Sequence, residues 1–104
     1  MSDERMKLVE AAPGEFTVSG EIDAHSADSF ATALESPGDG LDTIVVDLSE
    51  VTFMDSSGLR VLVGAQQRSD AGGPNLVLRS PSHQIVRLLD LAGLAETFDI
   101  QSPA

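Results

Sequence analysis

The sequence contains no cysteine, and no apolar run in its 104 residues approaches the ~18 residues that cross a membrane. Without cysteine there can be no disulfide framework, no thiolate nucleophile and no thiolate metal site. The first residues, MSDERMK, also lack the apolar centre of a signal peptide. These absences predict a cytoplasmic protein with no part in a membrane.

Basic residues are scarce as well. Six Lys and Arg stand against 17 Asp and Glu, which gives a formal net charge of −11. Phosphate backbones and anionic lipids would repel such a chain, so nucleic acid and membrane partners are not expected. The acids serve solubility, or they steer the protein toward a basic surface on a protein partner.

The hydrophobic pattern predicts one α/β domain over 1–104, with elements in the order ββαβαβαβ. The sheet is expected to be mainly parallel, with an N-terminal hairpin and with helices packed against it. Strands are expected at Met6–Val9, Phe16–Gly20, Thr43–Leu48, Asn75–Arg79 and Glu96–Ile100. Because TIVVDL is a continuous apolar run, we expect Thr43–Leu48 to be central and covered on both faces.

Three helices are expected between these strands. Ser26 is expected to be the N-cap of the first, which buries Ala27, Phe30, Ala31 and Leu34. The second runs from about Ser57 to Ser69 with Leu59, Leu62 and Val63 inward. The third is expected to have Ser80 as cap, Pro81 in its first position and Gly93 as terminator, with a buried stripe of Ile85, Leu88, Leu89 and Ala92.

An unusual polar stretch, FMDSSGLR, lies where the central strand meets the second helix. A helix start has unpaired N–H groups, so Asp55, Ser56 or Ser57 is expected to cap it. Capping explains one of these side chains, and Gly58 would lower helix stability by roughly 1 kcal/mol. The other interpretation is that a serine is there to be phosphorylated, with the phosphate facing the N–H groups and Gly58 leaving bare backbone for a partner.

Three stretches together resemble the bacterial anti-sigma factor antagonists, the STAS domain family. They are GEID (Gly20–Asp23), IVVDLSEVTFMDSSGLRVL (Ile44–Leu62) and SPSHQIVRLLDLAGL (Ser80–Leu94). The resemblance implies that Ser56 is phosphorylated by the partner itself, an anti-sigma factor with serine kinase activity. It implies that the unmodified protein binds this kinase and frees the sigma factor, and that a metal-dependent serine phosphatase resets it. Such a regulator supplies no catalysis, and we expect no cofactor, no metal and a monomer or weak dimer.

The sequence departs from the family pattern at Arg60, where a second glycine is frequent. A long basic side chain beside the phosphorylation site is expected to influence partner choice. With the chain ending at Ala104, the C-terminal helix of many relatives is expected to be absent. The expected partner surface consists of Asp23, Asp55, Ser57, Gly58, Arg60 and Gly64.

Gly64 has two interpretations. On a helix with Leu59, Leu62 and Val63 inward, Arg60, Gly64 and Gln67 share another face. A glycine there is explained by a closely approaching partner, or by close packing of the helix within the domain.

Two other functions fit the sequence less well. Asp23, Asp47 and Asp55 could converge at one sheet edge to hold Mg²⁺, as in a receiver domain with Asp47 as phospho-acceptor. The receiver pattern fails, because there is no acidic pair after the first strand and no lysine after the fourth. Turn hydrogen bonds account for Asp23 and Asp47 equally well.

A serine hydrolase is also not expected. MDSSG lacks the glycine two places before the nucleophile, and His25 and His83 fit surface or capping positions. The remaining alternative is a constitutive STAS scaffold, either a stressosome-like subunit or an accessory subunit of lipid transport.

Overall fold

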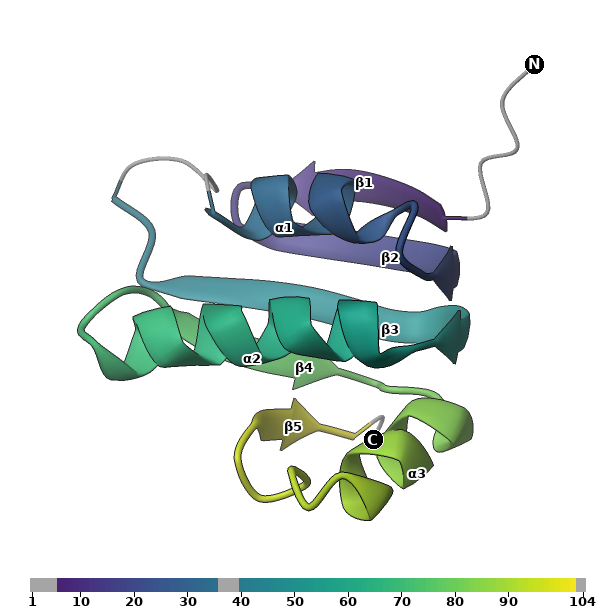
Figure 1. Cartoon of the computed structure of the whole chain (residues 1–104). Coiled ribbons are helices and arrows are strands. Elements are labelled where there is room, and N and C mark those ends of the chain that lie inside the picture. Colours follow the sequence, from purple (N-terminus) through teal and green to yellow (C-terminus); the bar gives the residue numbers. More distant parts are fainter. Residues whose placement is uncertain (1–5, 36–39, 103–104) are drawn as a thin grey trace.

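The protein forms a five-stranded sheet with helices between the strands (Figure 1). The computed structural model describes residues 6–35 and 40–102. Strands β1 (Met6–Ala12) and β2 (Glu15–Ile22) form an antiparallel hairpin. Strands β3 (Thr43–Met54), β4 (Asn75–Arg79) and β5 (Asp99–Gln101) follow β2 in parallel, so the strand order along the sheet equals the order along the chain.

The connections between the parallel strands carry α1 (Ala27–Glu35), α2 (Ser56–Asp70) and α3 (His83–Leu91). The expected order ββαβαβαβ, the N-terminal hairpin and the mainly parallel sheet are confirmed. Because each crossover leads to the next strand of the sheet, right-handed connections put the helices on one face. Figure 1 shows α1 and α2 side by side over the near face.

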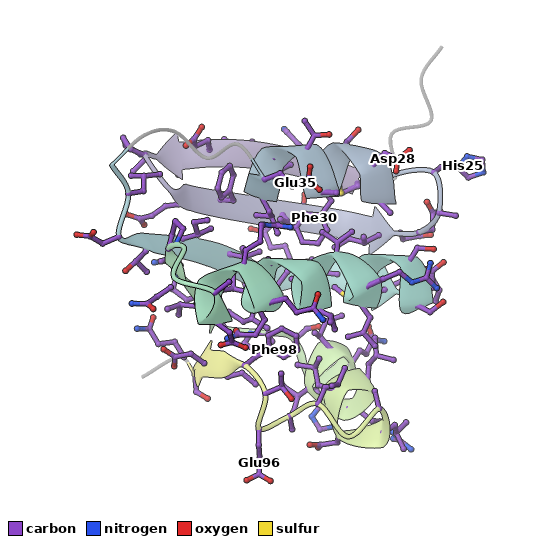
Figure 2. All side chains as sticks on the ribbon, turned by 60° about the vertical axis from the view of Figure 1, so that its left-hand side comes forward. His25, Asp28, Phe30, Glu35, Glu96 and Phe98 are labelled. Carbon is purple, nitrogen blue, oxygen red and sulfur yellow. The ribbon has the colours of Figure 1, made fainter. Side chains whose placement is uncertain are left out.

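The single core lies between that face and the helices. Phe30 of α1, Leu62 of α2 and Leu89 of α3 belong to the same buried cluster as Val18 of β2 and Val46 of β3. Phe98 belongs to this cluster too, and Figure 2 labels Phe30 beside α1 and Phe98 between α2 and α3. All three helices are thus anchored on the same side of the sheet.

The prediction that Thr43–Leu48 is covered on both faces is wrong. Burial alternates along the strand, with Ile44, Val46 and Leu48 buried and the intervening residues only partly so or exposed. The continuous apolar run has another cause: Val45 lies beside Val77 of β4 on the open face, where the two β-branched side chains cover each other.

Strand β3 is also much longer than predicted and runs on to Met54. The sequence did not predict this extension, because the apolar pattern is interrupted by Ser49, Glu50 and Thr52. Two irregularities in the pairing with β2 absorb extra residues of β3, and they turn Val51 and Met54 into the core. As a result, the strand leads directly into the polar stretch at Asp55.

The start of α3 differs from the prediction. Ser80 does not cap the helix, because its φ of 51° places it in the left-handed region, outside the helix. The N-cap is Ser82, and His83 is the first helical residue. The Ser82 hydroxyl donates to the carbonyl oxygen of Val51 at 3.0 Å, so it ties α3 to the extension of β3 instead of capping its own helix.

The end of α3 is as predicted. Gly93 has a φ of 73°, and the N–H of Leu94 donates to the carbonyl of Leu89 at 2.8 Å, the pattern of a glycine-terminated helix. Ala92, expected in the buried stripe, is exposed at the helix cap. The last strand begins at Asp99 and not at Glu96, because Phe98 first turns into the core.

Three charged residues join the strands on the open face of the sheet. The guanidinium of Arg79 lies 3.5 Å from Glu15 Oε1 on β2 and 3.5 Å from Asp47 Oδ2 on β3. The N–H and hydroxyl of Ser49 donate to Asp47 Oδ1 at 2.9 and 2.7 Å. Desolvation acts to raise the pKa of Asp47, but these hydrogen bonds and Arg79 together hold it below its ordinary value of 3.8.

This network predicts a pH-dependent loss of stability. Since the pKa of Asp47 is lower in the folded than in the unfolded protein, ionised Asp47 stabilises the fold above its unfolded pKa. The contribution disappears as pH falls through the folded pKa. We expect Asp47→Asn to lower the free energy of unfolding by roughly 0.5–1.5 kcal/mol at pH 7, and by progressively less below pH ~4.

Urea denaturation at a series of pH values measures this difference. Asp99→Asn, on the same face beside Val77, is the matched control and should change little. An Asp47→Asn effect that stays constant down to pH ~2 would show that ionisation is not its source.

Candidate functional site

The carboxyl ends of β2 and β3 lie side by side, and each leads into a polar loop. Ile22 pairs with Met54, and the N–H of Asp55 donates to the carbonyl of Ile22 at 3.2 Å. Asp23 and Asp55 therefore follow neighbouring strand ends at one edge of the sheet, as the sequence predicted for these two residues.

Asp55 is the N-cap of α2. Its Oδ1 accepts hydrogen bonds from the N–H groups of Ser57 at 2.8 Å and Gly58 at 3.4 Å. Its carbonyl accepts from the N–H of Leu59, which makes Ser56 the first helical residue. The capping interpretation is confirmed for Asp55, and capping therefore does not account for the two serines.

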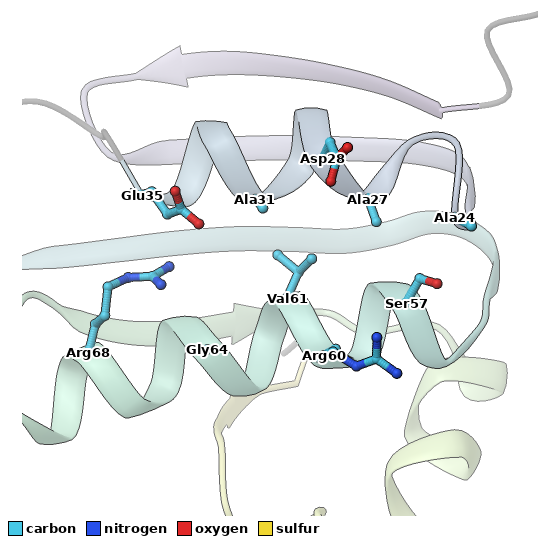
Figure 3. A pocket seen from close by; sticks show the side chains of 10 residues that line it. All are labelled: Ala24, Ala27, Asp28, Ala31, Glu35, Ser57, Arg60, Val61, Gly64 and Arg68. Carbon is cyan, nitrogen blue, oxygen red and sulfur yellow. The ribbon is translucent and has the colours of Figure 1, made fainter.

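The two serine side chains have different surroundings. Ser56 is exposed, and its hydroxyl makes no hydrogen bond to any residue within 6–35 and 40–102. Ser57 is partly buried and lines a groove between α1 and α2 (Figure 3). Of the two hydroxyls, that of Ser56 is the more accessible to a modifying enzyme.

Gly58 is buried, contrary to the expectation of bare backbone open to a partner. A Cβ at this position would lie 2.7 Å from both Ile22 Cγ2 and Met54 Cγ. The glycine is thus required by packing within the domain, because it lets the first turn of α2 sit directly on the ends of β2 and β3.

The groove between α1 and α2 has a volume of about 330 Å³. Its α1 wall was not predicted: Ala27 and Ala31 were expected in the core, but they are only partly buried and face the groove. Ala24, Ala27 and Ala31 lie three or four residues apart, so small side chains line the α1 side of the groove. The same spacing is typical of a buried helix face, and the sequence therefore did not distinguish the two. In Figure 3 Val61 points toward α1 and Arg68 extends toward Glu35. The groove is lined by Ala24, Ala27, Asp28, Ala31, Glu35, Ser57, Arg60, Val61, Gly64 and Arg68.

Gly64 differs from Gly58. A Cβ at Gly64 would meet only Arg68 Nη1, at an ordinary contact distance of 3.7 Å. The interpretation of Gly64 as a close-packing residue of the domain is therefore wrong. Arg60 and Gly64, predicted to share a helix face with Gln67, both line the groove, whereas Gln67 is exposed and lies outside it.

Asp23 organises the turn that leads into α1. Its Oδ1 accepts from the N–H groups of His25 at 2.9 Å and Ser26 at 3.2 Å, and its own N–H donates to Ser26 Oγ at 3.0 Å. Desolvation opposes these hydrogen bonds, but they prevail and lower the pKa of Asp23. Ser26 stands just before α1, although its hydroxyl bonds back to Asp23 instead of capping forward.

Of the three carboxylates considered for one sheet edge, Asp47 does not lie with Asp23 and Asp55. Asp47 lies well before the end of β3, where it bonds to Ser49 and Arg79. In the part of the chain that the structure describes, no three His, Cys, Asp or Glu side chains are grouped to hold a metal ion. In the same part, no helix combines the length and apolar character needed to cross a membrane.

The family follows from these features together with comparisons to known proteins. The STAS domain model matches residues 7–103, and the chain belongs to the STAS domain family. Within it, the Anti-sigma-B factor antagonist of Listeria monocytogenes is 38% identical over 87 residues, which cover 82% of this chain and 75% of that relative. Anti-sigma factor antagonists are regulatory proteins and not enzymes.

Solved structures agree with this assignment. An anti-sigma factor antagonist from Mycobacterium paratuberculosis superposes with a TM-score of 0.76 at 29% identity, covering 98% of this chain and 90% of that one. The Bacillus cell fate determinant SpoIIAA in its phosphorylated form superposes with a TM-score of 0.64 at 21% identity, covering 93% and 91%. The second likeness is one of fold alone.

The two glycines of α2 give opposite predictions for stability. Gly58→Ala should lower the free energy of unfolding by roughly 1–3 kcal/mol, because the new methyl group overlaps Ile22 and Met54. Gly64→Ala should raise it by up to ~1 kcal/mol, because alanine favours the helix and nothing obstructs its methyl group. Denaturant titration measures the free energy of unfolding of both variants, and equal changes would contradict the different surroundings of Gly58 and Gly64.

Proposed function

We propose that this protein is an anti-sigma factor antagonist that is switched by phosphorylation of Ser56. Unmodified, it binds an anti-sigma factor with serine kinase activity and frees the sigma factor. Phosphorylation by that partner ends the binding, and a metal-dependent serine phosphatase restores it. The carrying observation is the exposed Ser56 hydroxyl, which directly follows the Asp55 cap and has no hydrogen bond to other described residues.

Accessibility supports this role for Ser56. A kinase can reach an exposed hydroxyl at the first position of a helix without unfolding the domain, and no native hydrogen bond must be broken first. The relatives support it too, since the Listeria monocytogenes protein is named an Anti-sigma-B factor antagonist and SpoIIAA has a phosphorylated form.

The partner surface in this proposal extends from the edge that carries Ser56 into the groove. Ser57, Arg60 and Gly64 line the groove. Because Gly64 has no side chain, the groove is open at this position. Asp23 and Asp55 hold the two adjoining loops through their hydrogen bonds. Gly58 contributes indirectly, because its packing fixes the start of α2.

Electrostatics explains how the switch works without a change of fold. Phosphorylation adds about −1.5 to −2 charges, and a helix N-terminus stabilises an exposed anion by typically 0.3–1 kcal/mol. Like charges facing each other in an interface cost several kcal/mol, and each ~1.4 kcal/mol is a tenfold loss of affinity. Repulsion of the partner therefore outweighs the local stabilisation, and the modified domain remains folded but unbound.

Phosphorylation of Ser56 can be tested by intact mass with a candidate kinase and ATP. The unmodified protein should gain one phosphate, Ser56→Ala should gain none while still binding the kinase, and Ser56→Asp should lose binding. Ser57→Ala is the matched control and should still be phosphorylated. If Ser56→Ala still gains a phosphate and Ser57→Ala gains none, the phosphorylated residue is Ser57. Absence of any modification by cognate kinases would favour the constitutive scaffold.

The groove is tested by Gly64→Gln. The long side chain should fill the groove and weaken binding to the anti-sigma factor at least tenfold, or ~1.4 kcal/mol. The fold should remain intact, because a side chain at this position meets only Arg68. Calorimetric titration with Gly64→Ala as control measures the effect. Unchanged binding by Gly64→Gln would place the interface outside the groove.

A further inference from the structure

Arg60 lies one helical turn after Ser56 on α2. Side chains four residues apart on a helix are neighbours, with Cβ atoms ~5–6 Å apart, and long side chains lean toward the N-terminus. Figure 3 shows the guanidinium of Arg60 extending toward the end of α2 where Ser57 lies. Arg60 is exposed, and no ion pair joins it to another residue in the described ranges.

Three amide groups at the start of α2 already donate hydrogen bonds to Asp55. The N–H groups of Ser57 and Gly58 donate to Asp55 Oδ1, and that of Leu59 donates to the Asp55 carbonyl. A phosphate on Ser56 would therefore find few free N–H groups and would lie beside the Asp55 carboxylate, in a chain of net charge −11. The helix terminus therefore offers this dianion its partial positive charge but few hydrogen bonds.

We propose that Arg60 binds the phosphate of phosphorylated Ser56 within the same chain, and so stabilises the phosphorylated state. This inference rests on the proposed function, because it requires Ser56 to be the modified residue. A guanidinium can offer two parallel N–H donors to a phosphate, which an exposed lysine cannot do. Arg60 acts here as a positioning residue for the modified serine.

The contact also strengthens the switch. Unmodified protein presents Arg60 as a free cation on the proposed partner surface. Phosphorylation occupies that cation and adds negative charge at the same place, so the partner loses an attraction and meets a repulsion. Phosphate held by Arg60 is also less accessible to the phosphatase, so Arg60 would slow the return to the binding form.

The test places phosphoserine at position 56 during synthesis of the full chain, so no kinase is needed. A ³¹P NMR titration then gives the second pKa of the phosphate. We expect Arg60→Gln to raise it by about 0.5 pH unit, because a nearby cation favours the dianion. Arg60→Lys should restore part of the shift. Arg68→Gln, a groove arginine directed toward Glu35, should leave the pKa unchanged.

Other charged groups at this edge are common to all variants. They are Asp55, Asp23 and His25 on the two loops, and Asp28 on the groove wall. The comparison between Arg60→Gln and Arg68→Gln therefore isolates Arg60. A second readout is the rate of dephosphorylation by a metal-dependent serine phosphatase, which should be faster in Arg60→Gln.

Equal phosphate pKa values in the unaltered and Arg60→Gln chains would overturn the inference. Unphosphorylated Arg60→Gln should unfold at the same denaturant concentration as the parent, so a pKa change could not be assigned to a damaged fold. Failure of a kinase to modify Ser56 would instead count against the proposed function, and the two failures are separately visible.

Discussion

The contact on which the site depends is the packing of Gly58 against Ile22 and Met54. It brings the first turn of α2 directly onto the paired ends of β2 and β3. Asp55 then spans the junction, because its N–H bonds back to Ile22 and its side chain bonds forward into the helix. Ser56 is held outward as a consequence, since the residues on both sides of it are committed to this junction.

The same junction explains why a short polar stretch can combine stability with accessibility. Asp55 satisfies the helix start, so neither serine hydroxyl is needed for folding. Modification of a serine hydroxyl would therefore leave the cap intact. Asp55 caps the helix and leaves Ser56 and Ser57 outside the cap, whereas a single capping serine would have its hydroxyl occupied by the helix N–H groups.

A second constraint is the one-sided coverage of the sheet. With strands in sequential order, all helices lie on one face, and the open face is joined by Arg79 and its two carboxylates. The helix side is left with a groove where α1 and α2 meet, because alanines and Gly64 do not fill the space between them. The two faces thus have different roles, one in holding the strands together and one in presenting the groove beside Ser56.

The sequence by itself determined the element order, the hairpin, the Gly93 helix terminator and the capped polar stretch at the start of α2. These features depend on the periodicity of apolar residues and on hydrogen bonds between residues a few positions apart. A short stretch of sequence is therefore enough to predict them. The residues of the family resemblance also lie in these segments. Sequence alone therefore identified Ser56 and Asp55 as neighbours at a helix start.

Only the tertiary structure decided which residues touch across the chain. Gly58 and Gly64 are the same residue type on one helix, but Ile22 and Met54 lie against the first and only Arg68 approaches the second. Likewise, Asp47 was separated from Asp23 and Asp55 by the added length of β3, which depends on irregular pairing with β2. The length of β3 and the coverage of one face alone arise from contacts between distant segments, and no local spacing encodes such contacts.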